Sequence, residues 1–133
     1  ADAAAVRAAA PLLEAGAAAF DAWMRDLKDG SIDPAGHARL LAVAAESRAH
    51  AAAFLTDAAE RAPEGADASL VRAADDLDAS SQVFSGILRE VFPRPDDVGL
   101  AERRAIAAGM LATAKRREAS ARLHLVDAAA ALR

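Results

Sequence analysis

Cysteine and tyrosine are absent from this chain, and tryptophan occurs only once. Without cysteine there is no disulfide framework, no thiolate metal site and no cysteine nucleophile. Aromatic residues make up only 4% of the 133 residues, so large side chains for a core are scarce. The sequence therefore excludes a small disulfide-stabilised fold and any chemistry that depends on a thiol.

Long apolar runs are missing as well. No stretch approaches the ~18 consecutive apolar residues of a membrane span, so no integral membrane segment is expected. The alanine-rich start lacks a basic region followed by a strongly apolar one, which a secretory signal would require. A cytoplasmic location is favoured, and Ala1 as the first residue of a mature secreted domain is the alternative.

Alanine accounts for 41 residues, within a hydrophobic content of 54%. Because alanine is a strong helix former with a small side chain, alanine-rich seams favour closely approaching helices and no strands. A chain of this length is expected to form one domain over residues 1–133, with a single core.

Turn signals divide the chain into four helical segments. Gly30 provides a helix stop, Asp33 an N-cap and Pro34 a first helical residue. Pro63 and Gly65 mark the second break, and Pro93 and Pro95 mark the third. The predicted helices cover residues 2–28, 34–62, 68–92 and 97–132. Their short connections predict an all-α, antiparallel up-down-up-down four-helix bundle.

Apolar residues in the first helix recur every seven positions at Val6, Leu13, Phe20 and Leu27. Trp23 and Met24 lie near the end of this helix. An aromatic ring beside a flexible thioether is suited either to lining a small-molecule pocket or to plugging the end of the bundle. His37, in the first turn of the second helix, falls within ~40° of the core-facing stripe. It is interpreted as a hydrogen-bonded structural residue, with a ligand-binding role as the alternative.

The last helix places charges where apolar residues are expected. On a helical wheel, Arg103, Arg117 and Glu118 all lie within ~60° of the core-facing centre. Buried charges must be paired, reach the surface or line a wet cavity, because an unpaired one costs several kcal/mol. One explanation for these charges is that they pair within the helix or that the long arginine side chains reach the surface. The alternative is a polar pocket in which Arg103, Arg117 or Arg48 of the second helix holds an anionic ligand.

The outer face of the same helix shows the opposite anomaly. Leu123 and Val126 lie ~120–180° from the core-facing centre, where polar residues are expected. Together with the basic run that contains Lys115 and Arg116, they predict a surface for a homodimer or a helical protein partner. A helix rotated by ~60–100° would instead expose Glu118 and bury these two residues.

The net charge of −4 argues against nucleic-acid binding, which depends on neutralising phosphates. The charge is unevenly distributed. Residues 98–133 carry seven basic and three acidic side chains, whereas residues 1–97 carry nine and seventeen. The last helix is thus a basic element that complements acidic neighbours within the chain or an acidic partner outside it.

Motifs for catalysis and metal binding are lacking. Carboxylate-bridged di-metal bundles use Glu-x-x-His pairs, and here only Glu46 and His50 come close, four residues apart on a solvated face. Neither a metal nor a cofactor is expected, and the protein is predicted not to be an enzyme. The sequence favours an interaction module that self-associates or docks a partner through its C-terminal helix. A ligand-binding or sensor bundle with a small pocket between helices is the alternative, and a ferritin-like metal-binding bundle is a remote one.

Overall fold

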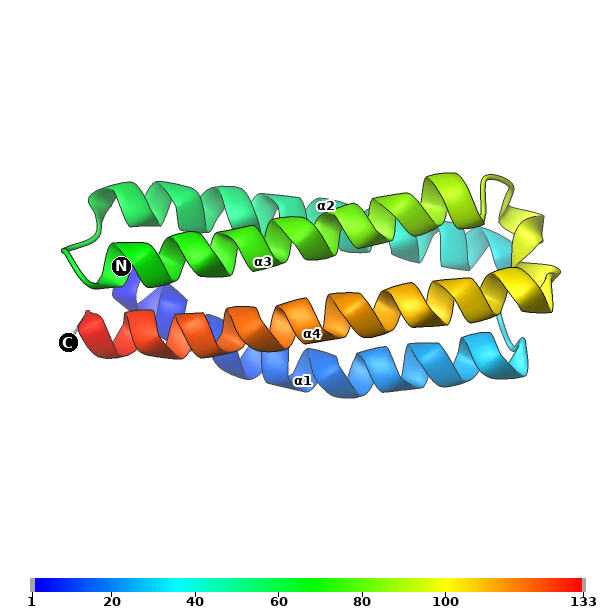
Figure 1. Cartoon of the computed structure of the whole chain (residues 1–133), viewed down its shortest axis with the longest axis horizontal. Helices are drawn as coiled ribbons and strands as arrows, with labels where there is room; N and C mark the ends of the chain where they lie inside the picture. The colour runs from blue at the N-terminus through cyan, green and yellow to red at the C-terminus, as the bar shows by residue number, and fades with distance from the viewer. Residues whose placement is uncertain (1, 133) are drawn as a thin grey trace.

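The computed structural model describes the backbone of residues 2–132 and the side chains of residues 16–132. Its main elements are four α-helices, α1 (Asp2–Asp29), α2 (Pro34–Arg61), α3 (Ala66–Gly86) and α4 (Ala101–Ala131). Figure 1 shows the chain reversing direction at each connection, so that α1 begins and α4 ends at the same end of the bundle. No strand occurs within residues 2–132. The prediction of an all-α four-helix bundle is confirmed.

The turn between α1 and α2 follows from its residues. Gly30 ends α1 with a φ of +76°, a conformation that glycine adopts without steric strain. The Asp33 carboxylate accepts a hydrogen bond from the backbone N of Gly36 at 2.8 Å, which caps the first turn of α2. Pro34 is the first residue of α2, where its missing N–H leaves no bond unmade.

The start of α3 lies two residues before the predicted position. Gly65, at a φ of +101°, precedes the helix, and Ala66 is already helical. Asp67 therefore lies inside the first turn, where its carboxylate accepts from the backbone N of Gly65 at 3.2 Å and of Ala68 at 2.9 Å. The side chain supports this turn from within the helix.

The connection from α3 to α4 is more structured than an extended loop. α3 continues into a π-helical turn, η1 (Ile87–Val91), and a short 3-10 helix, η2 (Pro95–Gly99), follows. Asp97 accepts from the backbone N of Arg94 at 3.0 Å, so its carboxylate caps η2 and not the last helix. For this reason α4 begins at Ala101, four residues after the predicted start.

The four helices do not pack equally. α2 packs on α3, α3 on α4 and α4 on α1, whereas the backbones of α1 and α2 hardly approach each other over the described residues. The short turn joins these two helices at one end, but side chains must bridge the space between them. α1 is therefore held mainly by α4, which leaves a groove along α2.

The core is divided between two ends of different character. One cluster, built from α2, α3 and α4, contains only alanine and leucine. The other contains all of the large buried aromatic side chains among residues 16–132, and is made up of Phe20, Leu27, Leu41, Ala44, Phe84, Ile87, Val91, Phe92, Val98, Ala107, Leu111 and Ala114. Val6 and Leu13, predicted to extend the α1 stripe, lie outside the residues whose side chains are described. The aromatic end contains the residues that sequence reasoning selected for a pocket.

The orientation of α4 decides between the two alternatives left by the sequence. Glu118 is only 3% exposed, whereas Leu123 is 56% exposed and Val126 47% exposed. A rotation that exposes Glu118 is therefore wrong. The inward-facing anomaly is confined to Glu118, because the side chains of Arg103 and Arg117, which the helical wheel placed near the core-facing centre, are 41% and 44% exposed. The outward-facing anomaly is present, since Leu123 and Val126 face the solvent.

Candidate functional site

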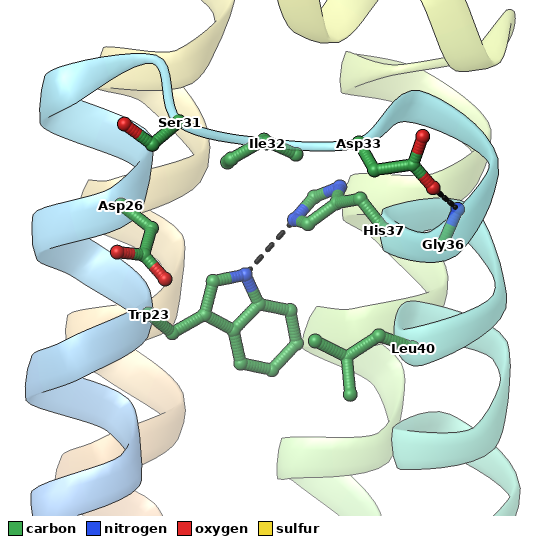
Figure 2. Close-up of a pocket in the computed structure, with 8 residues that line it drawn as sticks. All are labelled: Trp23, Asp26, Ser31, Ile32, Asp33, Gly36, His37 and Leu40. Atoms are coloured by element: carbon green, nitrogen blue, oxygen red, sulfur yellow. Dashed lines mark hydrogen bonds between the residues drawn. The ribbon is translucent and has the colours of Figure 1, made fainter.

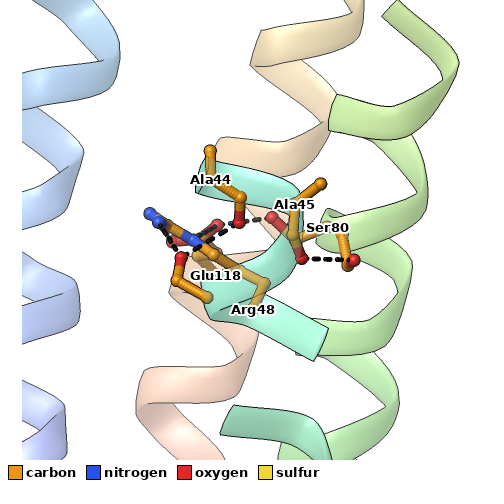
Figure 3. A network of polar contacts seen from close by, with 7 residues as sticks. Ala44, Ala45, Arg48, Ser80 and Glu118 are labelled. Carbon is orange, nitrogen blue, oxygen red and sulfur yellow. Dashed lines mark hydrogen bonds and ion pairs between the residues drawn. The ribbon is translucent and has the colours of Figure 1, made fainter. Parts of the chain in front are cut away.

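A polar cluster lies at the centre of the bundle, where α2, α3 and α4 meet (Figure 3). The Arg48 guanidinium contacts both carboxylate oxygens of Glu118, with Nε at 3.1 Å from Oε2 and Nη2 at 3.2 Å from Oε1. The Ser80 hydroxyl donates a further hydrogen bond to Oε2 of Glu118. Arg48 also donates through Nη1 to the Ser47 hydroxyl at 3.1 Å. Three of the five N–H donors of Arg48 are thus used within the protein, and its anion-holding role stays a prediction.

Arg48 also lies over an aromatic ring. Its guanidinium carbon is 5.3 Å from the ring centroid of Phe84, which is fully buried. Such a cation–π contact adds to the fixed orientation of the guanidinium. The arginine thus joins the polar cluster to the aromatic end of the core.

The two arginines at the start of α4 stabilise the ends of other elements. Arg103 donates to the carbonyl of Val91 at 2.9 Å and lies 3.7 Å from the Asp97 carboxylate. Arg104 donates to the carbonyls of Leu27 at 2.9 Å and Val98 at 3.0 Å. Terminal helix carbonyls have no partner within their own helix, and a guanidinium satisfies them while complementing the helix dipole. Arg104 was not among the predicted site residues, although it lies seven residues before the buried Leu111 and fourteen before the buried Glu118, on the same face of α4.

Arg117 forms an ion pair that the sequence did not suggest. Its Nε lies 3.1 Å from Oδ1 of Asp76 on α3, and Nη2 lies 3.5 Å from the carbonyl of Asp75. Asp76 is buried, and its Oδ2 has no hydrogen-bond partner among the described residues. His124 Nε2 lies 3.8 Å from this oxygen. Asp76 was not among the predicted site residues, although its position three residues after Ala73 and four before Ser80 places it on the inner stripe of α3.

Trp23 and His37 meet between α1 and α2 (Figure 2). Trp23 Nε1 donates to His37 Nε2 at 2.9 Å, and His37 also packs edge-on against Phe92, with ring centroids 5.5 Å apart. Burial lowers the pKa of His37 from its ordinary value of 6.5. Since Nε2 accepts a hydrogen bond, the imidazole is neutral and carries its proton on Nδ1. The structural interpretation of His37 therefore fits this geometry.

Open hollows surround this pair. One of about 250 Å³ is lined by Trp23, Asp26, Ser31, Ile32, Asp33, Gly36, His37 and Leu40. A second of about 250 Å³ shares Trp23 and Leu40 with it and continues along Phe20, Val43 and Arg48. The two form one groove between α1 and α2. Met24 lines a separate hollow between α1 and α4, of about 440 Å³, so the structure does not bring it together with His37.

The predicted partner-binding residues lie apart from one another. Lys115 forms an ion pair with Asp21 of α1, at 2.7 Å between Nζ and Oδ1. Arg116 is exposed and donates to the Thr113 hydroxyl at 3.1 Å. Leu123 and Val126 are exposed further along α4. Lys115 thus stabilises the packing of α1 on α4. Of Lys115, Arg116 and Arg117, only Arg116 has no acidic partner among the described side chains.

Within residues 16–132, no group of three or more histidine and acidic side chains is arranged to hold a metal ion. The same part of the chain contains no helix with the length and hydropathy to cross a membrane. No protein-family model, curated protein or solved structure matches the chain.

Protonation of His37 is expected to loosen the aromatic end. The pKa of His37 is lower in the folded than in the unfolded state, so the unfolded chain takes up the proton first as the pH falls. The contribution of neutral His37 to stability is complete above pH ~6.5 and declines below it. Trp23, the only tryptophan, reports the loss of its own hydrogen bond through its fluorescence. We expect a change in its emission with a midpoint below 6.5.

The variant His37→Gln is the matched control, because the glutamine side chain also offers an acceptor but does not titrate in this range. Its Trp23 emission should be flat between pH 5 and 8. Asp26 and Asp33, which line the same hollow, remain in both proteins. An identical pH profile in the variant would show that another group causes the change.

Proposed function

We propose that this protein is a non-enzymatic helical interaction module that self-associates. The observation that carries the proposal is the distribution of apolar side chains over the outer faces. Eight large apolar side chains among residues 16–132 are exposed, namely Leu40, Val43, Phe54, Val71, Leu100, Ile106, Leu123 and Val126. Single exposed apolar residues are ordinary, but clusters of them mark contact surfaces. Two such groups occur, on the outer face of α2 and near the end of α4.

The paired state of three arginines supports the same proposal. Arg48, Arg103 and Arg117, which the sequence offered as ligand-binding groups, each contact a carboxylate or carbonyl of the protein itself. An anionic ligand would compete with these contacts for the guanidinium groups. The outer apolar residues, in contrast, gain burial from a partner without losing an existing bond.

A ligand-binding bundle is the second candidate, and the groove between α1 and α2 favours it. The groove offers the apolar and aromatic surface of Phe20, Trp23, Leu40 and Val43 to a small molecule. Ligand sites are concave and mostly apolar, as this groove is. Of its polar groups, Trp23 and His37 are already bonded to each other and Arg48 is paired with Glu118, so these three offer fewer free donors and acceptors to orient a ligand.

Sedimentation equilibrium from micromolar to millimolar concentration tests self-association. The apparent mass is expected to rise from 13.7 kDa towards twice that value as the concentration increases. A constant monomer mass over the whole range contradicts the proposal. If that monomer shows saturable quenching of Trp23 by an apolar dye such as anilinonaphthalene sulfonate, the ligand-binding candidate takes its place.

A further inference from the structure

An exposed face of α2 carries an apolar row with charges beside it, and Leu40 and Val43 of this row also line the groove between α1 and α2. Leu40, Val43 and Phe54 are 47%, 57% and 43% exposed. Arg39 and Asp57 are also exposed, and they lie 18 residues apart, which is about five turns at ~3.6 residues per turn. Both charges therefore point in the same direction from the helix. We call the five residues the α2 stripe.

Four of the five residues of the α2 stripe form two pairs that are nearly symmetric about its middle. Leu40 lies seven residues before Ser47, and Phe54 lies seven after it. Arg39 lies nine residues before Arg48, and Asp57 lies nine after it. An antiparallel second copy centred between residues 47 and 48 would set Leu40 opposite Phe54 and Arg39 opposite Asp57. At a rise of ~1.5 Å per residue, each pair lies within about one residue of direct opposition.

The charges of the α2 stripe are available for such pairing. Among the side chains of residues 16–132, neither Arg39 nor Asp57 forms a hydrogen bond or an ion pair. Other basic residues, such as Arg48 and Lys115, are paired within the chain. An isologous interface repeats each contact twice, so one arginine and one aspartate per chain give two ion pairs around a shared apolar row.

We propose that two copies of this chain associate through their α2 stripes, as antiparallel helices related by a two-fold axis near Ser47. The inference rests on the proposed self-association and names its surface and partner. The apolar row supplies burial, and the flanking ion pairs fix the antiparallel direction and the register.

The apolar group at the end of α4 lacks this symmetry. Arg116 lies seven residues before Leu123, and the residue seven after it is Ala130. A copy paired about Leu123 leaves Arg116 without an acidic residue opposite. Residues 98–133 also carry an excess of basic side chains, and two such helices repel each other when they pack together.

Charge reversal tests the register. Arg39→Glu places two acidic residues opposite each other twice per dimer, and Asp57→Arg does the same with two basic ones. Each single variant is expected to raise the dissociation constant by about tenfold or more, since every surface pair changes from attraction to repulsion. The double variant Arg39→Glu/Asp57→Arg restores both pairs and should associate like the wild type. Arg72→Glu, at an exposed position on α3, is the control and should leave the dissociation constant unchanged.

A cysteine cross-link tests the position of the two-fold axis. The chain has no cysteine, so Ser47→Cys introduces a single exposed thiol next to its symmetry mate. Air oxidation is expected to convert this variant to a covalent dimer in high yield at concentrations where the wild type associates. Ala130→Cys, exposed on α4, should stay mostly monomeric under the same conditions.

The outcomes separate the inference from the proposal beneath it. A wild type that stays monomeric overturns both. A wild-type dimer that is dissociated by Leu123→Glu but not by Leu40→Glu confirms self-association. In that case the assignment of the interface to the α2 stripe is wrong. Failure of the double charge variant to restore association also overturns the register. Far-ultraviolet circular dichroism of every variant checks that the helices are intact.

Discussion

Replacing Arg48 by methionine is expected to lower the free energy of unfolding by about 3 kcal/mol. The change leaves Glu118, only 3% exposed, without its cation and with Ser80 as its remaining side-chain partner. Breaking a buried ion pair by removing one partner is strongly destabilising, because the other charge stays buried and unpaired. The expected loss lies at the low end of the known range because the Arg48 side chain is itself 29% exposed. Urea unfolding followed by circular dichroism gives the value directly.

The double variant Arg48→Met/Glu118→Leu shows whether the pair itself stabilises the fold. Removing both charges eliminates the buried unpaired carboxylate, so the double variant should recover most of the stability lost by Arg48→Met. Arg72→Met on the exposed face of α3 is the matched control, with an expected change within about 0.5 kcal/mol. A double variant as unstable as the single one would mean that packing of the arginine over Phe84, and not the charge of Glu118, is responsible.

Replacing Phe84 by alanine is expected to destabilise the protein by about 4 kcal/mol. Phe84 is fully buried, and its ring stacks on Phe20 and Trp23 with centroids 5.9 Å and 5.6 Å away. The substitution removes the centre of the aromatic cluster and leaves a cavity that the small neighbouring alanines cannot fill. The Trp23 emission should shift to longer wavelength in the folded variant, because water gains access to the indole.

Phe54→Ala is the matched control for this cavity. Phe54 is 43% exposed, so the same chemical change there removes far less buried surface. At protein concentrations below the association range, its effect on stability should be below about 1 kcal/mol. At high concentration the same variant should dimerise less, because Phe54 belongs to the α2 stripe. Equal destabilisation by both alanine variants would contradict the burial of the aromatic cluster.

The sequence contained enough local information to determine the fold class. Alanine-rich segments with recurring apolar positions form helices, and the turn at Gly30, Asp33 and Pro34 lies where its residues require it. The wheel of α4 also identified Glu118 as a buried carboxylate and Leu123 as an exposed apolar residue. These features follow from helical periodicity, which depends only on residues within a few turns.

The partners of the buried charges were beyond local reasoning. Glu118 pairs with Arg48, 70 positions earlier, and Arg117 pairs with Asp76 on a different helix. Which residues meet depends on the rotation and the axial shift of whole helices. A shift of one turn, ~5.4 Å, would give each charge another neighbour. The partner of Asp76 was missed for this reason, and so were the carbonyls of Leu27 and Val98 that Arg104 contacts at the end of α1 and in η2.

The sequence by itself determined four helices, the turn between the first two and the anomalous residues Glu118, Leu123 and Val126 of α4, because propensity, capping and periodicity are properties of short segments. Only the tertiary structure decided that α1 lies mainly on α4, that a groove opens along α2, and that Trp23 and His37 bridge the two helices across it. Those features depend on which helix faces pack together, and several alanine-rich faces are of similar size. The sum of many small packing contacts over the whole bundle determines which of these pairings is most stable.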